Sequence, residues 1–373
     1  GTDIIVGQLK VSAEDKGVSL ISGDDIIDGG DTGGEDIQAS KLLISSTGAT
    51  GHDDTDLDAL EIAVDALTVN SGDAGLFLNE TDMVQVQEVS TSINRVDNTG
   101  GVSANVVDAR EDLLSSGNGS IVLVSGGALS ITEGSLEDGQ GDTAGLKAAG
   151  SGNVFLQALS GDIDVQSRIS ATDGNISMKT EAGDILQSAT GHINTAGSID
   201  LVASASISMS DGGTTTSTGA DIRYQAGTDI IVGQLKVSAE DKGVCLVAGD
   251  AIIDGGDTGG EDIQGSKLLI SSTGATGYND TDLNALEIAV DGLAAVSGQA
   301  GLFLNETDQV TVREVSTSIS RINEAANISE LVSNSLEDLR TSAEGSIVLM
   351  SGGNLMVNEG SLADEDGDTL GIK

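Results

Sequence analysis

Short segments in which apolar and polar residues alternate recur along much of the chain. Between Ser151 and Leu246 they take the form Gly-x-(Ile/Val)-x-apolar, as in GNVFL, GDIDV, GNISM, GSIDL and ADIRY. Such alternation is typical of a β-strand that buries one face. Gly, Asn, Asp, Ser and Thr fill the intervals between these segments and predict turns. The pattern therefore predicts many short strands joined by turns.

The spacing of the segments predicts how the strands assemble. Two sets of apolar positions recur at a nearly constant step: Val154, Ile176, Ile199, Ile222 and Val244, and Ile163, Ile185, Ile207 and Ile230. A short strand with one apolar face cannot bury that face alone, but coils stacked on one another form a continuous core. We therefore expect an all-β fold, a parallel β-solenoid with about 22–23 residues per coil.

A much longer repeat contains these coils. The segment GTDIIVGQLKVSAEDKG at residues 1–17 returns unchanged at residues 227–243, and the offset of 226 holds without a gap to the end of the chain. Residues 1–226 are thus expected to form a first long repeat of the solenoid, and residues 227–373 a partial second repeat continuous with it. Because the chain starts and stops inside a repeat, we expect it to be a piece of a longer protein.

Two stretches fit the solenoid pattern less well. Ile328, Leu331, Val332, Leu336 and Leu339 have helical spacing, and we expect an insertion or a short helix there. In the segment LDALEIAVDAL, at residues 57–67, the apolar positions suit a helix and a strand equally well. The periodicity alone leaves these two alternatives open.

Composition and charge narrow the classes of function. The chain has no Pro and 1% aromatic residues, whereas 38% of its residues are apolar, which argues against both an aromatic core and intrinsic disorder. The net charge of -44 repels nucleic acid and anionic membranes and favours metal cations or basic surfaces as partners. No apolar stretch approaches the roughly 20 residues that a membrane helix requires. We therefore expect neither nucleic-acid binding nor membrane insertion.

Several segments together resemble a known family. GSIDLVASASISMSDGG, GADIRYQAGTDIIVGQL, GVSLISGDDIIDGG and SKLLISSTGATG are similar to the repeat regions of giant bacterial surface proteins and adhesins of the filamentous haemagglutinin-like type. The resemblance covers nearly the whole chain. It implies a right-handed parallel β-helix, an extracellular location at the cell surface, and a structural or adhesive role. The extreme acidity of this chain departs from many such proteins.

Candidate catalytic residues are few. His52 is replaced by Tyr278 in the second copy, and Cys245 by Ser19 in the first, so neither defines a site that both copies share. Paired carboxylates leave a β-helix carbohydrate-active enzyme as an alternative, but such a site usually has aromatic platforms, and the chain has only 2 Tyr and 3 Phe. We therefore expect no catalytic residues and no enzymatic activity.

The acidic loops are better candidates for cation sites. The segment DGGDTGGED occurs twice, and near the end of the chain acidic residues alternate as at the start of a Ca²⁺ loop. The candidate ligands are Asp28, Asp31, Glu35 and Asp36, their copies Asp254, Asp257, Glu261 and Asp262, and Asp364, Asp366 and Asp368. The sequence around the last three lacks the Gly and Glu positions of a complete Ca²⁺ loop, so plain solvated turns remain the alternative.

Together these features favour a non-enzymatic structural segment of an extracellular filament, stalk or giant adhesin. The alternatives are the carbohydrate-active enzyme and an acidic module that binds cations or mineral. The expected partners are further copies of the repeat, stacked head to tail or in one long array, and divalent cations. No cofactor is expected other than Ca²⁺, which would offset the repulsion between Asp side chains stacked about 4.8 Å apart in neighbouring coils.

Overall fold

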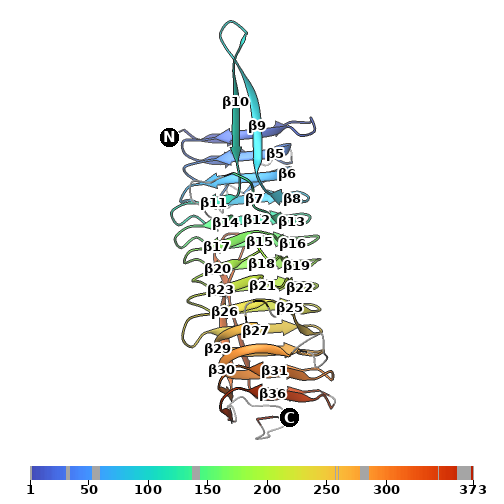
Figure 1. Ribbon diagram of the computed structural model, residues 1–373. Coiled ribbons are helices and arrows are strands. Elements are labelled where there is room, and N and C mark those ends of the chain that lie inside the picture. Colours follow the sequence, from blue (N-terminus) through green and yellow to red (C-terminus); the bar gives the residue numbers. More distant parts are fainter. Residues whose placement is uncertain are drawn as a thin grey trace. The chain divides into compact units, whose positions relative to one another are not determined.

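The computed structural model describes residues 2–30, 34–52, 59–136, 143–256, 258, 260–277, 285–342, 344–358 and 371–372. These residues divide into two compact units. Figure 1 labels strands from which the coils of each unit are built. Unit 1 comprises Gly1–Asp173 and Glu324–Asn327, and unit 2 comprises Gly174–Asn323 and Ile328–Lys373. The start of the second long repeat at Gly227 therefore lies inside unit 2.

Both units are built from β-strands. Unit 1 contains β1 (Ile4–Val6), β2 (Leu9–Lys10), β3 (Gly17–Ile21), β4 (Ile26–Asp28), β5 (Ile37–Ser45), β6 (Leu60–Ser71), β7 (Leu76–Glu80), β8 (Val84–Val86), β9 (Val89–Val96), β10 (Val102–Arg110), β11 (Leu113–Ser115), β12 (Ile121–Ser125), β13 (Leu129–Ile131), β14 (Ala144–Ala148), β15 (Val154–Ala158), β16 (Ile163–Val165) and β17 (Arg168–Ala171). Unit 2 contains β18 (Ile176–Thr180), β19 (Ile185–Gln187), β20 (Ile193–Thr195), β21 (Ile199–Ala203), β22 (Ile207–Met209), β23 (Thr214–Ser217), β24 (Ile222–Ala226), β25 (Ile230–Val232), β26 (Gln234–Val237), β27 (Gly243–Ala248), β28 (Ile252–Asp254), β29 (Ile263–Ser272), β30 (Leu286–Ser297), β31 (Leu302–Glu306), β32 (Val310–Val312), β33 (Val315–Ile322), β34 (Ile328–Leu336), β35 (Leu339–Thr341), β36 (Ile347–Ser351) and β37 (Leu355–Val357).

The coils of unit 2 follow the predicted step. Ile176 pairs with Ile199, Ile199 with Ile222, and Ile222 with Val244, all in parallel register, so each coil has the length that the sequence predicts. These four side chains are fully buried and form a ladder along the core. The pairing of β24 with β27 carries the solenoid through the repeat boundary at Gly227 without a break. The predicted all-β parallel solenoid is therefore confirmed.

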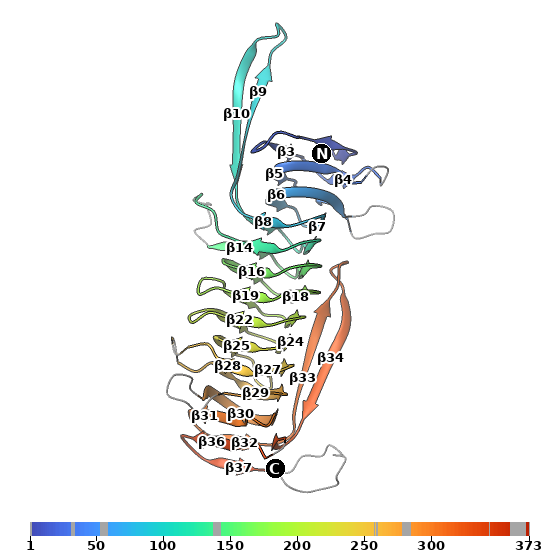
Figure 2. The same ribbon diagram turned by 90° about the vertical axis from the view of Figure 1, so that its right-hand side faces the viewer.

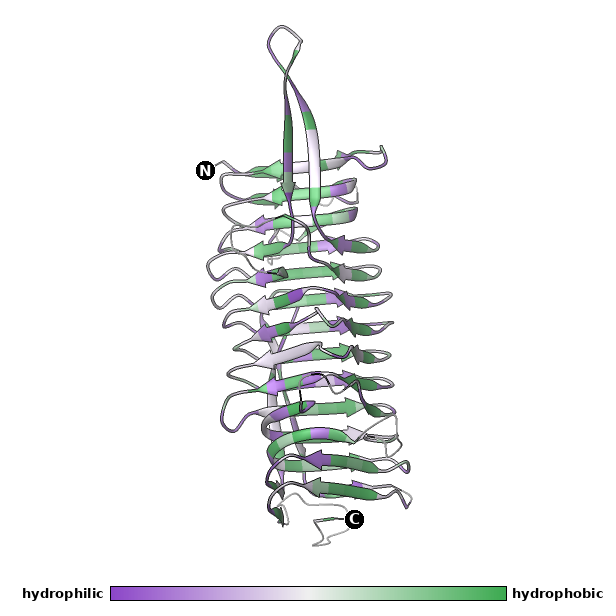
Figure 3. Cartoon of the chain, in the orientation of Figure 1, coloured by the Kyte–Doolittle hydropathy of each residue, from purple (hydrophilic) through white to green (hydrophobic). Residues whose placement is uncertain are grey.

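The step is longer in other coils. In unit 2, Val244 pairs with Leu268 and Leu268 with Leu293, so these two coils are slightly longer than those of the Ile ladder. In unit 1, Leu76 pairs with Ile121, and this much longer step accommodates the inserted strands β9 and β10. Figure 3 shows apolar residues concentrated along the strands of the coils. Many of their side chains are buried, as in the Ile ladder.

The ambiguous segment at residues 57–67 is resolved in favour of a strand where the structure describes it. Leu60, Ile62 and Val64 in β6 are buried, and the residues between them are less so. Ile62 pairs with Ile37 of β5 in the adjacent coil. Pairing with a neighbouring coil, which a single segment does not reveal, decides the conformation.

An antiparallel hairpin is inserted into the coils of each unit (Figure 2). In unit 1 it is formed by β9 and β10, and in unit 2 by β33 and β34. The insertion predicted around Ile328 is thus confirmed, but the alternative of a short helix is wrong. Val332 and Leu336 lie on the half-buried face of β34 and Leu331 on the exposed face, so strand alternation underlies the apparent helical spacing.

Within the part of the chain that the structure describes, no helix could cross a membrane.

Candidate functional site

The two copies of DGGDTGGED each connect the end of one strand to the start of the next. In unit 1, Asp28 is the last residue of β4 and Asp36 immediately precedes β5. Their carboxylates gather with that of Glu61 in β6, and one oxygen from each of the three lies within 4.8 Å of the others. Three carboxylates at this separation provide the hard oxygen ligands that Ca²⁺ prefers.

Unit 2 repeats this arrangement at the equivalent positions, Asp254, Asp262 and Glu287. In both copies the first acid accepts a hydrogen bond from the backbone N–H of the Gly two residues later. Asp28 Oδ1 accepts from Gly30 and Asp254 Oδ1 from Gly256, both at 2.7 Å. We call these groups of three carboxylates the acidic clusters of unit 1 and unit 2.

The second acid of each cluster is fixed to the adjacent coil. Asp36 Oδ2 accepts a hydrogen bond from the N–H of Glu61 at 3.2 Å, and Asp262 Oδ2 accepts one from the N–H of Glu287 at 3.0 Å. The other carboxylate oxygen of Asp262, Oδ1, is buried and has no hydrogen-bond partner among the described residues. This oxygen is available for a cation held by the cluster.

Burial makes the ionised clusters unfavourable. Asp36 is 2% exposed and Asp262 is 1% exposed. Burial, with a smaller contribution from the charge of Asp28, raises the pKa of Asp36 to about 7. Burial raises the pKa of Asp262 to about 9, with a smaller contribution from the charge of Asp254. A divalent cation would favour the ionised form by neutralising charges that are otherwise both buried and mutually repulsive.

The structure separates Glu35 and Glu261 from the clusters. Glu35 accepts hydrogen bonds from Gln38 at 2.7 Å and Thr81 at 3.1 Å, and Glu261 accepts them from Gln264 at 3.1 Å and Thr307 at 2.9 Å. These hydrogen bonds keep the pKa of both carboxyl groups below the usual value. The largest effect comes from the backbone N–H of the same residue, which donates to its own carboxylate. Neither residue belongs to the group of three carboxylates in its unit.

The remaining predicted ligands lie outside the described residues. These are Asp31, Asp257, Asp364, Asp366 and Asp368. Conversely, the sequence prediction missed Glu61 and Glu287. Each precedes a buried Ile that pairs with the Ile following the second acid, as Ile62 pairs with Ile37. The sequence signal that could have identified these two ligands is an acidic residue directly before an Ile that occupies the same coil position as the Ile after Asp36 or Asp262.

Many other Asp side chains connect successive coils through backbone hydrogen bonds. Asp184 Oδ1 accepts the N–H of Ser206 at 2.7 Å, and Asp229 Oδ1 accepts the N–H of Ala251 at 2.9 Å. Each of these acids lies just before a strand and binds the equivalent position of the next coil. The Asp that recurs directly before an Ile thus has a structural role, because it satisfies a backbone donor at the turn.

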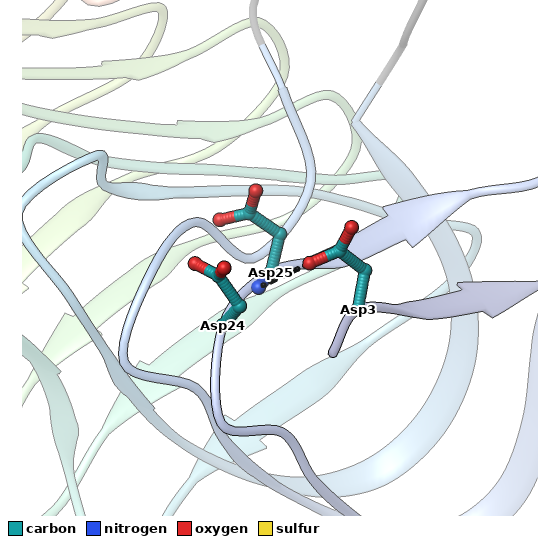
Figure 4. Close-up of side chains that lie close together, drawn as sticks. All are labelled: Asp3, Asp24 and Asp25. Carbon is teal, nitrogen blue, oxygen red and sulfur yellow. Dashed lines mark hydrogen bonds between the residues drawn. The ribbon is translucent and has the colours of Figure 1, made fainter. Parts of the chain in front are cut away.

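A third acidic group shows the same role in unit 1. Asp3, Asp24 and Asp25 lie close together (Figure 4). Asp3 Oδ1 accepts the N–H of Asp25 at 3.5 Å, and Asp25 Oδ1 accepts the N–H of Ala49 at 2.7 Å. Because the second copy has Ala251 in place of Asp25, this group of three acids is not repeated there. It is a weaker candidate for a cation site than the acidic clusters.

Two further features of the structure bear on chemistry. Glu111, Asp112 and Glu133 also bring carboxylate oxygens together in unit 1, where Glu111 Oε2 accepts the N–H of Leu136 at 2.9 Å.

In unit 2, a hollow of about 260 Å³ is lined by Asp291, Gln309, Thr311, Arg313 and Asn358. That lining supplies one carboxylate, whereas glycoside hydrolysis generally uses two.

Comparison of the chain with protein-family models, curated proteins and solved structures finds no match. Function must therefore be inferred from the fold and from the geometry of the acidic clusters.

Proposed function

We propose that this chain is a non-enzymatic structural segment of an extracellular filament, stalk or giant adhesin built from stacked β-helix repeats. One observation carries the proposal: the two copies of the long repeat form the same coils. Val18 pairs with Leu42 in unit 1 as Val244 pairs with Leu268 in unit 2, at equivalent positions of the two copies. Repetition of one geometry suits a protein that provides length, whereas a catalytic site is local and concave.

The resemblance to the repeat regions of filamentous haemagglutinin-like surface proteins supports the extracellular assignment. The partners in this proposal are further copies of the same repeat. A coil at the end of a solenoid presents unpaired strand edges that pair with another coil of the same geometry. Stacking of repeats would therefore extend the parallel ladders already seen within each unit.

The proposal includes divalent cations, with Ca²⁺ as the first candidate. The acidic cluster of unit 2 supports it, because Asp262 is 1% exposed and its Oδ1 has no hydrogen-bond partner among the described residues. The cluster recurs in unit 1 with the same three residue types. Cations bound at these positions would stabilise each repeat against the repulsion of its own acids.

Immunogold electron microscopy of the native cell surface tests the structural role. Antibodies against the 373-residue chain should decorate thin fibres at the cell surface. Gold particles along the length of such fibres would support the proposal. Labelling confined to the cell interior, or to compact particles released from the cell, would contradict it.

A further inference from the structure

The hairpin of unit 2 is bound along the side of the coils that precede it in the sequence (Figure 2). Three N–H groups that alternate along β33 donate hydrogen bonds to side chains from successive coils: Ser318 to Asp221 Oδ2 at 2.9 Å, Ser320 to Ser198 Oγ at 3.3 Å, and Ile322 to Ser177 Oγ at 2.9 Å. The coils thus recognise the hairpin through its backbone, with one side chain from each of three successive turns of the solenoid.

An ion pair and apolar contacts complete this interface. Arg321 Nε lies 2.7 Å from Asp200 Oδ2, and Asp200 is also paired with Arg223 at 2.7 Å. Ile319 and Ile322 on β33 are 0% and 1% exposed. The coil surface formed by residues 174–226 therefore offers a negative charge, hydrogen-bond acceptors and cover for two apolar side chains. We call it the hairpin-binding surface.

The hairpin of unit 1 carries the same residue types without that cover. Ile93, Arg95 and Val96 of β9 are equivalent to Ile319, Arg321 and Ile322. Ile93 is 50% exposed and Val96 is 61% exposed, and Arg95 makes no ion pair with the described residues.

Among the described residues of unit 1, the base of the hairpin is the part that packs on the unit's own coils. Val89 at the start of β9 is buried with Leu43 and Ala66, as Val315 at the start of β33 is buried with Leu269 and Ala294. Beyond this base, β9 and β10 extend past β3 (Figure 2). The two hairpins therefore begin alike on their own coils, and they differ in whether coils lie beneath the rest of β9 or β33.

We propose that the distal part of β9 binds the hairpin-binding surface of a second copy of the repeat. In the repeat order, residues 174–226 directly precede the position equivalent to Gly1, so coils of that sequence added before Gly1 would lie beneath β9 as residues 174–226 lie beneath β33. Ile93 and Val96 become buried, and Arg95 pairs with the counterpart of Asp200. The inference deepens the proposed function and rests on it: each hairpin fastens its own repeat to the preceding one.

A cysteine-accessibility experiment tests this docking. The full 373-residue chain is compared with the same chain extended at its N-terminus by a copy of residues 148–226, both carrying Cys245→Ser, which places at that position the residue found at Ser19. Ile93→Cys should react with a maleimide about tenfold or more slowly in the extended chain, because docking must open before the thiol is reached. Val107→Cys is the matched control: Val107 is 64% exposed, its equivalent Ser333 is exposed in the docked hairpin, and its rate should be the same in both chains.

A further variant tests the recognition chemistry. Arg95→Gln removes the hairpin's side of the expected ion pair and, because Arg95 makes no ion pair with the described residues, leaves the coils of both copies unaltered. It should therefore speed labelling of Ile93→Cys by about threefold or more in the extended chain and leave the rate in the short chain unchanged. Equal labelling of Ile93→Cys in the short and extended chains would overturn the inference. Slow labelling already present in the short chain, measured when it is monomeric, would overturn it as well, because another occupant would then cover the face.

Failure of the inference is distinguishable from failure of the proposed function. Small-angle scattering and far-ultraviolet circular dichroism show whether the added coils join the solenoid and lengthen it. Added coils that join while Ile93→Cys stays reactive would contradict hairpin docking and leave the stacking of repeats intact. Added coils that remain unfolded would contradict both.

Discussion

Arg321 donates a hydrogen bond from Nε to Oδ2 of Asp200 at 2.7 Å, across 121 residues of sequence. The contact joins β33 to the coil that contains β21. Asp200 Oδ1 accepts a second charged hydrogen bond from Arg223, also at 2.7 Å. One buried carboxylate thus holds two guanidinium groups, one from a coil and one from the hairpin.

Removing this carboxylate should destabilise unit 2. Asp200→Ala leaves Arg223, which is 5% exposed, buried without its ionic partner, and we expect a loss of about 3–5 kcal/mol in the free energy of unfolding. Urea denaturation followed by circular dichroism measures the change. Lys179→Ala is the control, since it breaks the exposed pair with Glu181 in the same unit and should cost about 1 kcal/mol or less. A loss for Asp200→Ala no larger than that of the control would contradict the assignment.

Buried Glu80 should make the stability depend on pH. Its carboxylate accepts the N–H of Val64 at 3.0 Å and of Asp82 at 3.2 Å, and burial raises its pKa to about 8. Because this pKa lies above the usual value near 4.5, the unfolded chain loses the proton first. The contribution of Glu80 to stability is therefore greatest below about pH 4.5 and is lost as the pH rises to about 8.

Glu80→Gln removes this ionisation. The variant should be more stable than the parent chain at pH 9, by about 2–4 kcal/mol, and should show little gain at pH 5. Glu88→Gln is the control, because hydrogen bonds from Ser135 hold the pKa of Glu88 below its usual value and its ionised form is favoured in the folded chain. Denaturation at the two pH values measures both variants, and an equal gain for Glu80→Gln at pH 5 and pH 9 would refute the prediction.

The number of residues per coil could be predicted from the sequence because one buried Ile recurs at the same position of each regular coil. Ile176, Ile199 and Ile222 each fill the same core position one turn apart, so their spacing is the length of a coil. The insertion around Ile328 could be predicted as a departure from the coil pattern, but the packing of β33 along the coils could not, because the residues that bind β33 lie far away in sequence. Ile322, for example, binds Ser177 at a separation of 145 residues.

The acidic clusters were predicted in part for a related reason. Asp28 and Asp36 belong to one visible sequence segment, and the structure brings them together. Glu61 reaches them from the next coil, and the hydrogen bond from its N–H to Asp36 spans 25 residues of sequence. The pairing of Ile37 with Ile62 fixes this register. A shorter step, like that of the coils around Ile199, would have placed a different residue beside Asp36.

The turn at Gly277 should not tolerate a side chain. Gly277 has a φ of 65°, and a Cβ atom there would lie 2.3 Å from the carbonyl oxygen of Phe303. Gly277→Ala therefore combines left-handed strain with a backbone clash, and we expect a loss of about 2 kcal/mol or more in the free energy of unfolding. Gly23→Ala is the control, since nothing lies within 4 Å of the position of its Cβ. Denaturation that gives equal stabilities for the two variants would show that the backbone relaxes around the new methyl group.

Calcium should stabilise the chain specifically through the acidic clusters. Thermal unfolding is measured in chelator, in CaCl₂, and in NaCl of matched ionic strength, because NaCl reproduces the general screening of the -44 net charge. At a Ca²⁺ concentration about 100 times the dissociation constant, each site would add about 2.7 kcal/mol, seen as a higher melting temperature in CaCl₂ than in NaCl. The double variant Asp36→Asn/Asp262→Asn should lose this difference, since it removes the central carboxylate of each cluster. Glu35→Gln/Glu261→Gln, which alters acids of the same two loops that do not belong to the clusters, should retain it. Equal stabilisation of the parent chain by CaCl₂ and NaCl would exclude specific sites and leave only a diffuse ion cloud around the acidic coils.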